Sequence, residues 1–232
     1  MIPGASSAPA GERQRLYGVY PAIVTDVQDP DSQGRVQIRL PFVEESDGGS
    51  ALAWARLATL MAGADRGTWF IPEVDDEVLV AFTAGDPRRP VVIGALWNGV
   101  DTPPESMDSA NNIRSITSRS GHTLTFDDTA GAEKVELKTN GGHTFTLDDA
   151  AGGTVTLTHS NGAQVKIDVV GNIEITANVR VKVQAPAGLE VTAAMVTVNS
   201  AMSTFSGVVK ADAVITNSVV SPSYTPGVGN IW

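Results

Sequence analysis

Cysteine is absent from the 232 residues of this chain. Its absence excludes both a disulfide framework and a metal site built on thiolates. Long apolar runs are also missing: none approaches the roughly 20 residues of a membrane-spanning helix, and the first residues lack the basic start and apolar stretch of a signal peptide. We therefore expect a chain that is made without a cleaved signal and is stabilised by packing or by assembly.

Lysine is missing from residues 1–110, which contain 8 Arg against 16 Asp and Glu, whereas residues 111–232 hold 8 basic and 10 acidic side chains. The formal net charge of −10 repels a phosphate backbone, and no run of basic residues offsets it locally. Nucleic acid is therefore not expected as a partner. The difference in charge composition between the halves predicts two distinct domains.

Proline is absent from residues 106–185, although Pro103 and Pro104 stand together just before that stretch. Paired prolines interrupt a hydrogen-bond ladder, and a long proline-free stretch permits one. We predict the following division of the chain: a flexible arm at 1–15, a barrel domain at 16–100, a linker at 101–115, and a repetitive β-structure with a C-terminal tip at 116–232.

Motifs of covalent chemistry are missing as well. The sequence contains no Gly-x-Ser-x-Gly elbow, no phosphate-binding loop and no dinucleotide-binding signature. We therefore expect no enzymatic activity and no cofactor.

Residues 16–100 contain short runs in which apolar residues alternate with polar ones, separated by turn signals such as Asp29-Pro30 and Gly34. No segment has a convincing helical period. This pattern predicts five or six strands in a small closed or partly open barrel. The expected strands cover 19–24, 35–41, 53–57, 67–72, 77–82 and 90–96.

The second half repeats itself. Residues 121–131, GHTLTFDDTAG, return as residues 142–152, GHTFTLDDAAG, and a third, degenerate copy begins at Asn161. Further alternating segments, expected as strands, are 165–169, 173–176, 179–183, 189–192 and 196–198. Such strands bury little when one chain folds alone, and their exposed edges invite aggregation. Self-association into a closed, fibrous prism resolves both problems.

The barrel half also carries groups of residues in a distinctive order. They include Tyr17-Gly18-Val19-Tyr20, Val24-Thr25-Asp26-Val27, Trp54-Ala55-Arg56, Ala62-Gly63, Ile71-Pro72-Glu73-Val74, and the run from Gly85 to Gly94. In this order they make the chain similar to the family of phage baseplate assembly protein V and VgrG-type spike proteins over essentially its whole length. One departure is Asp75, where the family usually has Gly; it bears only on the local turn, because Asp tolerates turn geometries.

The resemblance implies an all-β fold: an N-terminal OB-fold barrel followed by a C-terminal triple-stranded β-helix formed by trimerisation. It implies a structural function, the central spike or needle of a contractile tail or injection apparatus that pierces the target cell envelope and its membrane. The implied location is a virion tail or a phage-like injection particle assembled in the bacterial cytoplasm. The implied partners are two further copies of the chain and a separate baseplate hub protein at the barrel.

The C-terminal residues 221–232 end apolar, and an exposed apolar end marks a binding surface. By resemblance, this end would seat a PAAR-type tip protein, through Tyr224, Pro226, Val228, Ile231 and Trp232. The alternative is that Trp232 plugs the end of the prism.

His122 and His143 occupy equivalent positions of the repeat, so a trimer would place three copies of each in a ring. A single histidine per level is more typical of a surface or packed side chain, and we predict no metal there. Some relatives end in a His-x-His iron site, but the last histidine here is His159, far from the C-terminus. That tip metal is not expected.

Asp127-Asp128 and Asp148-Asp149 precede turns that contain glycine. Adjacent strand residues point to opposite faces, so we interpret both pairs as solvated turn residues rather than catalytic carboxylates or calcium ligands. Barrels can also stack sugars or single strands on aromatic residues, but no basic groove accompanies the aromatic residues of this one. We expect these side chains to pack in the core or between subunits: Trp54, Trp69, Phe70, Phe82 and Trp97.

Two other functions stay open. A carbohydrate-binding adhesin or receptor-binding fibre would need exposed aromatic or polar clusters on the shaft, whereas Phe126 and Phe145 fall on the alternating apolar face and are interpreted as core. A cell-wall hydrolase would need a compact α-rich domain, which the sequence does not contain.

Overall fold

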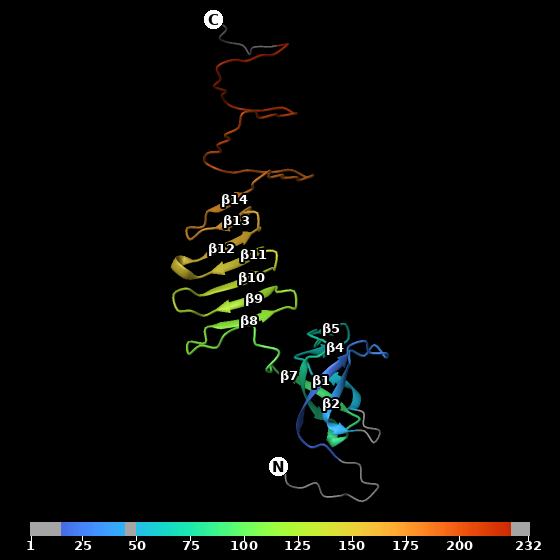
Figure 1. Cartoon of the computed structure of the whole chain (residues 1–232). Coiled ribbons are helices and arrows are strands. Elements are labelled where there is room, and N and C mark those ends of the chain that lie inside the picture. The colour runs from blue at the N-terminus through green and yellow to red at the C-terminus, as the bar shows by residue number, and fades with distance from the viewer. Residues whose placement is uncertain (1–14, 45–49, 224–232) are drawn as a thin grey trace, which may run out of the picture. The chain divides into compact units, whose positions relative to one another are not determined.

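A computed structural model of the chain describes residues 15–44 and 50–223 (Figure 1). These residues form strands, turns, extended segments and two short 3-10 turns, and no α-helix occurs among them. The predicted all-β class is therefore confirmed. The chain divides into two compact units, residues 1–180 and residues 181–232. In the described part of the chain, no helix is long and apolar enough to cross a membrane.

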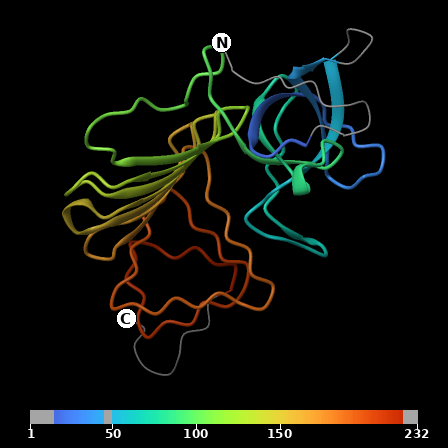
Figure 2. The same ribbon diagram turned by 90° about the horizontal axis from the view of Figure 1, so that it is seen from below.

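Five strands of the first unit close into a barrel in the order β1-β2-β3-β7-β6 (Figure 2). Their bounds are β1 Val19–Asp26, β2 Val36–Glu44, β3 Ser50–Leu57, β6 Glu77–Phe82 and β7 Pro90–Ala95. All neighbours are antiparallel except β3 and β7, and β1 pairs with β6 to complete the ring. A closed ring of this kind has no free edge that can recruit a foreign strand.

The barrel core follows from alternation along each strand. In β6, residues Val78, Val80 and Phe82 point inward, while the residues between them are only partly buried. The largest fully buried side chains of the barrel are Ile38, Val24, Val36, Val78 and Val80. The predicted strands therefore pack their apolar faces against one another.

The turn before β6 contains the departure from the family pattern. Asp75 has a φ of 77°, in the left-handed region that glycine usually occupies. Its backbone N–H donates to the carbonyl of Val24 (2.9 Å), and the Asp76 carboxylate accepts the backbone N–H of Glu73 (2.8 Å). Asp75 thus adopts a backbone conformation that favours glycine.

The expected strand at 67–72 is wrong. Only a minimal hairpin forms here, between β4 (Ala62–Gly63) and β5 (Arg66–Gly67), and the chain then runs on without strand pairing. Pro72 has no N–H to give to a ladder, and Gly67 sits so close to Met61 that an added Cβ would meet its carbonyl oxygen at 2.6 Å. The hairpin is therefore tight and short.

Residues 113–176 of the first unit form one seven-stranded antiparallel sheet, in which every strand pairs with its sequence neighbours (Figure 1). Its strands are β8 Ile113–Thr117, β9 Thr123–Asp127, β10 Lys134–Lys138, β11 Thr144–Asp148, β12 Thr154–Thr158, β13 Gln164–Ile167 and β14 Ile173–Thr176. The repeat recurs structurally, because its first two copies contain β9 and β11. β8 begins at Ile113, within the range 101–115 that we expected to be linker.

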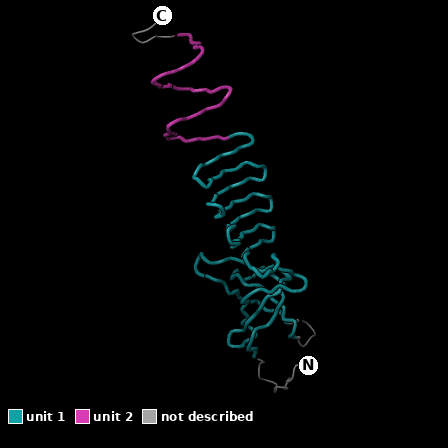
Figure 3. The backbone as a smooth tube through the Cα atoms, turned by 90° about the vertical axis from the view of Figure 1, so that its left-hand side faces the viewer, with its two compact units in different colours: residues 1–180 teal, residues 181–232 magenta. Residues whose placement is uncertain are grey.

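The second unit is extended but not paired (Figure 3). The described residues 181–223 contain no strand and no backbone–backbone hydrogen bond, and bends recur at 186–187, 194, 201, 206–207, 212, 217 and 222. The expected strands at 179–183, 189–192 and 196–198 are therefore wrong for a single chain. Their alternation is present in the sequence, but no other described segment of the same chain supplies a ladder partner.

Candidate functional site: an assembly interface

One face of the seven-stranded sheet is apolar. On this face the strand register aligns the side chains in two columns, and each column takes one residue from every strand. The first column is Arg114, Phe126, Val135, Leu147, Val155, Ile167 and Ile173; the second is Ile116, Leu124, Leu137, Phe145, Leu157, Val165 and Ile175. Arg114 is the single polar member, at the β8 end.

The described residues of the chain leave this apolar face uncovered. Phe126 is 42% exposed, Leu157 54% and Ile173 68%. We expected Phe126 and Phe145 to be core residues, but in a single chain both lie open. A sheet must bury its apolar face against another layer, and each such side chain gains roughly 1.5–3 kcal/mol when it is fully buried. The face is therefore incomplete without a second layer.

The opposite face of the same sheet is polar. Its central column is Ser115, Thr125, Glu136, Thr146, Thr156, Lys166 and Glu174, and Lys166 pairs in register with Glu174. Threonine suits an exposed strand, and opposite charges across a ladder stabilise it modestly. The two faces differ so strongly that only the apolar one is suited to a protein partner.

The second unit likewise leaves its apolar side chains uncovered, and the backbone of its described residues also lacks a strand partner. Its apolar side chains are exposed, for example Val183 at 67% and Leu189 at 70%. Backbone N–H and C=O groups also need hydrogen-bond partners once they are removed from water, and the described residues 181–223 form no backbone–backbone hydrogen bond with one another. A partner of this unit must therefore supply both apolar contacts and a backbone ladder.

The three histidines lie in the turns along one edge of the sheet. The Nδ1 of His122 accepts the backbone N–H of Asn140 (3.1 Å), and the Nδ1 of His143 accepts that of Ser160 (3.2 Å). The rings of His143 and His159 are 4.3 Å apart. Sequence reasoning missed this contact, because His159 precedes the Asn-Gly pair of its turn whereas His143 follows it. Within the described ranges, no three His, Asp or Glu residues are grouped as a metal site.

Of the paired aspartates, Asp128 and Asp149 are exposed residues of the turns, as predicted, whereas Asp127 and Asp148 are the last residues of β9 and β11 and are partly buried. The Asp127 carboxylate accepts hydrogen bonds from the hydroxyl (2.6 Å) and backbone N–H (3.0 Å) of Thr129, and the hydroxyl contact lowers the pKa of Asp127 below its ordinary value. Asp148 likewise accepts the backbone N–H of Ala150 (2.8 Å). Asp128 instead pairs with Arg114 (2.6 Å). These contacts close the turns between strands.

The aromatic residues of the barrel divide into two groups. Phe82 is buried, Tyr20 packs between Phe82 and Phe42, and Arg35 lies 5.8 Å from the ring centroid of Trp54. The other three are exposed: Trp69 at 76%, Phe70 at 73% and Trp97 at 69%. Core packing is therefore confirmed for Phe82 alone.

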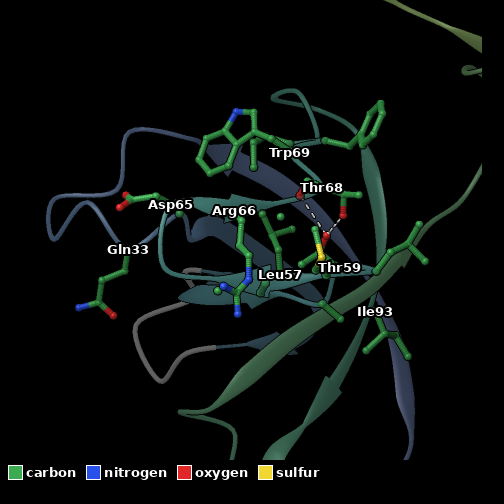
Figure 4. Close-up of a pocket in the computed structure, with 17 residues that line it drawn as sticks. Gln33, Leu57, Thr59, Asp65, Arg66, Thr68, Trp69 and Ile93 are labelled. Carbon is green, nitrogen blue, oxygen red and sulfur yellow. Dashed lines mark hydrogen bonds between the residues drawn. The ribbon is translucent and has the colours of Figure 1, made fainter.

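Two of these exposed residues, Trp69 and Phe70, border a hollow on the barrel surface beside the β4–β5 hairpin (Figure 4). Its volume is about 960 Å³, and its apolar wall includes Leu57, Met61, Trp69, Phe70 and Ile93. Arg66 and the hydroxyls of Thr59 and Thr68, which contact each other, supply polar groups. Leu60 and Met61 also line this hollow, and Leu60 is 95% exposed. Sequence reasoning did not select them, although two consecutive apolar residues between turn signals could have indicated an exposed apolar surface.

The proposed tip residues Tyr224, Pro226, Val228, Ile231 and Trp232 lie outside the described residues.

Two protein families match this chain. Residues 20–97 match the injector OB domain of type VI secretion systems and phage baseplates, and residues 134–204 match the phage baseplate V C-terminal trimerisation domain. The first segment contains the barrel strands, apart from the start of β1. The second contains β10–β14 and the beginning of the second unit.

Curated proteins match over 114 residues. The chain is 31% identical to the actin cross-linking toxin VgrG1 of Vibrio cholerae, and the matched region covers 46% of this chain and 10% of that protein. It is 30% identical to the type VI secretion system spike protein VgrG3 of V. cholerae (46% and 11%) and 28% identical to VgrG1a of Pseudomonas aeruginosa (45% and 18%). The chain thus spans less than a fifth of the length of these relatives.

Proposed function

We propose that this chain forms the central spike of a contractile tail or injection apparatus, because it belongs to the family of phage baseplate V and VgrG-type spike proteins. The spike is a homotrimer and its function is structural. Its place is in the tail or injection particle.

The apolar face of β8–β14 is the observation that carries this proposal. It spans every strand of the sheet and stays open in one chain, and the match to a trimerisation domain covers most of it. Three copies that turn these faces inward make a prism with a dry centre. The second unit, which has neither a ladder nor a core of its own, then winds with its two counterparts and pairs its backbone with theirs.

In this proposal, the spike transmits force and performs no covalent chemistry. Interchain ladders leave no free edge, and close packing resists compression, so a push at the barrel end reaches the tip without bending the shaft. The needle then pierces the target envelope and its membrane. Both matched segments are structural domains, so we assign no catalytic residue; an attached hydrolase and an adhesin shaft are less well supported.

The two ends would bind different proteins. The hollow beside Trp69 and Phe70 has an apolar wall that includes these exposed side chains, and we assign it to the baseplate hub protein. The C-terminal residues Tyr224, Pro226, Val228, Ile231 and Trp232 are assigned to a PAAR-type tip protein. Trp69→Ala with Phe70→Ala should abolish hub capture and leave tip capture unchanged, whereas a chain ending at Ser223 should show the reverse.

The mass of the purified protein, with and without heating in detergent, tests the central proposal. A complex of three chains that withstands detergent until it is heated supports the interwoven spike. A monomer at micromolar concentration would contradict it and would favour a binding module. A cell-wall clearing assay on the same preparation tests the hydrolase alternative.

A further inference from the structure

The two rows of turns at the ends of the strands carry different side chains. Each row is here called an edge of the seven-stranded sheet. The turns 118–122, 139–143 and 159–163 lie along one edge, here called the histidine edge, and contain Arg119, His122, His143 and His159 but no acidic residue. The turns 128–133, 149–153 and 168–172 lie along the other, the acidic edge, and contain Asp128, Glu133, Asp149 and Asp168 but no basic residue. The meander alone produces this separation, because alternate turns fall on opposite sides.

Threefold symmetry decides how these edges meet. In a ring of three copies that turn the same face inward, every contact is head-to-tail, so one edge of each sheet abuts the opposite edge of the next. Like edges never touch. We infer that each corner of the trimer is built from the histidine edge of one chain and the acidic edge of its neighbour. This inference rests on the trimeric spike proposed above and goes beyond it, because it names the surfaces that join the copies.

The spacing of the turns allows the two edges to interlock. Successive turns on one edge are two strands apart, which leaves roughly 9–10 Å between them, and the turns of the opposite edge occur one strand later. In a prism whose strands cross its axis, a turn of one copy therefore faces the gap between two turns of the next. His143 lies at the level between Glu133 and Asp149, and His159 at the level between Asp149 and Asp168.

The side chains also have the hydrogen-bonding capacity for this contact. Each histidine uses its Nδ1 to accept a backbone N–H of its own chain, so the neutral ring carries its proton on Nε2 and has that donor left for a partner. On the acidic edge, Asp168 is engaged with Asn172 and Asp128 with Arg114. Glu133 and Asp149 are exposed, and their carboxylates have no hydrogen bond or ion pair within the described part of the chain.

Arg119 is less available for this contact. Its guanidinium pairs with Glu73 at 3.0 Å. The inferred corner therefore depends mainly on the histidines and on Glu133 and Asp149.

Engineered disulfides test the edge pairing directly, because the chain has no cysteine of its own. Asp149 and Ser160 lie on opposite edges of one sheet, roughly 17 Å apart across five residues, which is too far for a disulfide within a chain. A chain carrying Asp149→Cys and Ser160→Cys should therefore give a covalent trimer on a non-reducing gel after mild oxidation. The matched control is Asn140→Cys with Ser160→Cys, both on the histidine edge, which should give no interchain band.

Charge exchange supplies the second measurement. His143→Glu and Asp149→Lys should each lower the midpoint temperature of trimer dissociation by at least about 3 °C, and the combined variant should recover most of that loss. Glu136→Lys, in the middle of the polar face, is the control and should leave the midpoint within about 1 °C. A stable trimer in which Asp149→Cys/Ser160→Cys does not cross-link, or in which the exchange does not compensate, overturns the inference and leaves the spike intact. A wild-type monomer instead overturns the proposed function itself.

Discussion

Asp29 organises the turn between β1 and β2 through its carboxylate. Its two oxygens accept the backbone N–H groups of Asp31, Gln33 and Arg35, and the Arg35 side chain pairs with it at 2.6 Å. The Arg35 contact, supported by these backbone bonds, holds the pKa of Asp29 well below its ordinary value of about 3.9. Asp86 is held in the same way by Arg88, which lowers its pKa to about 2. Both turns therefore depend on an ionised carboxylate.

Stability of the barrel should follow the charge of Asp29. A carboxyl whose folded pKa is depressed stabilises the fold above its unfolded pKa, and this contribution is lost as the pH falls from about 4 toward the folded pKa. We expect Asp29→Asn to lower the unfolding temperature at pH 7 and to weaken its fall between pH 5 and pH 2, as measured by circular dichroism. Asp65→Asn, at an exposed hairpin position, is the control. A variant with the wild-type acid profile would contradict this role.

The barrel core is sensitive to lost volume. Ile38 is fully buried on β2 among Val24, Val36 and Val80. Ile38→Ala should cost about 2–5 kcal/mol of unfolding free energy, and Ile38→Val about 0.5–1.5 kcal/mol. Urea titration of the full chain measures both, followed by tryptophan fluorescence in a Trp232→Phe background so that the remaining tryptophans all lie in the barrel half. Equal costs for the two variants would show that the site collapses around the smaller side chain.

In the strands β9–β12, adjacent residues point to opposite faces of the sheet, one to the apolar face that we propose to be the trimer interface and the next to the polar face. Phe145→Glu places a carboxylate at an interface that we propose to be dry, and an unpaired buried charge costs about 3–5 kcal/mol in each chain. We expect size-exclusion chromatography with light scattering to show loss of the trimer. Thr146→Glu is the matched control, because the next residue points to the opposite face, and it should leave the mass unchanged.

The outcome for Thr146→Glu also decides the orientation of the sheet. If Thr146→Glu disrupts the trimer and Phe145→Glu does not, the polar face is turned inward and the proposed prism is wrong.

Elements were predictable from the sequence where the partner strand lies nearby in the same chain. The barrel runs and the repeat at 121–152 alternate cleanly and end at turn signals, so β1, β2, β6, β9 and β11 follow from local pattern. The segment 67–72 failed because Trp69 and Phe70 are consecutive aromatic residues before Pro72 and fit no alternation. The alternation of apolar and polar residues at 179–183 and 189–192 is clear, but it shows only that each segment has one apolar and one polar face. It does not identify which chain supplies the neighbouring strand.

The candidate site needed the register as well as the pattern. Each apolar residue of β8–β14 is visible in the sequence, yet the two columns appear only when the strands are aligned. The contact between His143 and His159 and the division into a histidine edge and an acidic edge likewise arise from the order of the turns. The tip residues, including Trp232, stay a prediction, because they lie outside the described part of the chain.

At the scale of the whole molecule, the second unit sets the strictest condition on assembly. The apolar side chains of residues 181–223 are largely exposed, and their backbone groups form no hydrogen bonds with one another, so in the proposed trimer this unit gains its ladder from the other chains. Folding of this unit and association are then one event. Its stability depends on protein concentration, and its dissociation once formed is slow.

Hydrogen exchange distinguishes this coupled state from a loose tail. We expect amides in 181–223 to be protected in the assembled protein to about the same degree as those of β9–β12, although they form no backbone–backbone hydrogen bond within the described part of the chain. When Phe145→Glu dissociates the trimer, protection in 181–223 should be lost completely, while amides of the barrel, which pair within one chain, should keep theirs. Rapid exchange of 181–223 in an intact trimer would show that this unit does not form an interchain ladder, and that the trimer is held by the sheet faces alone.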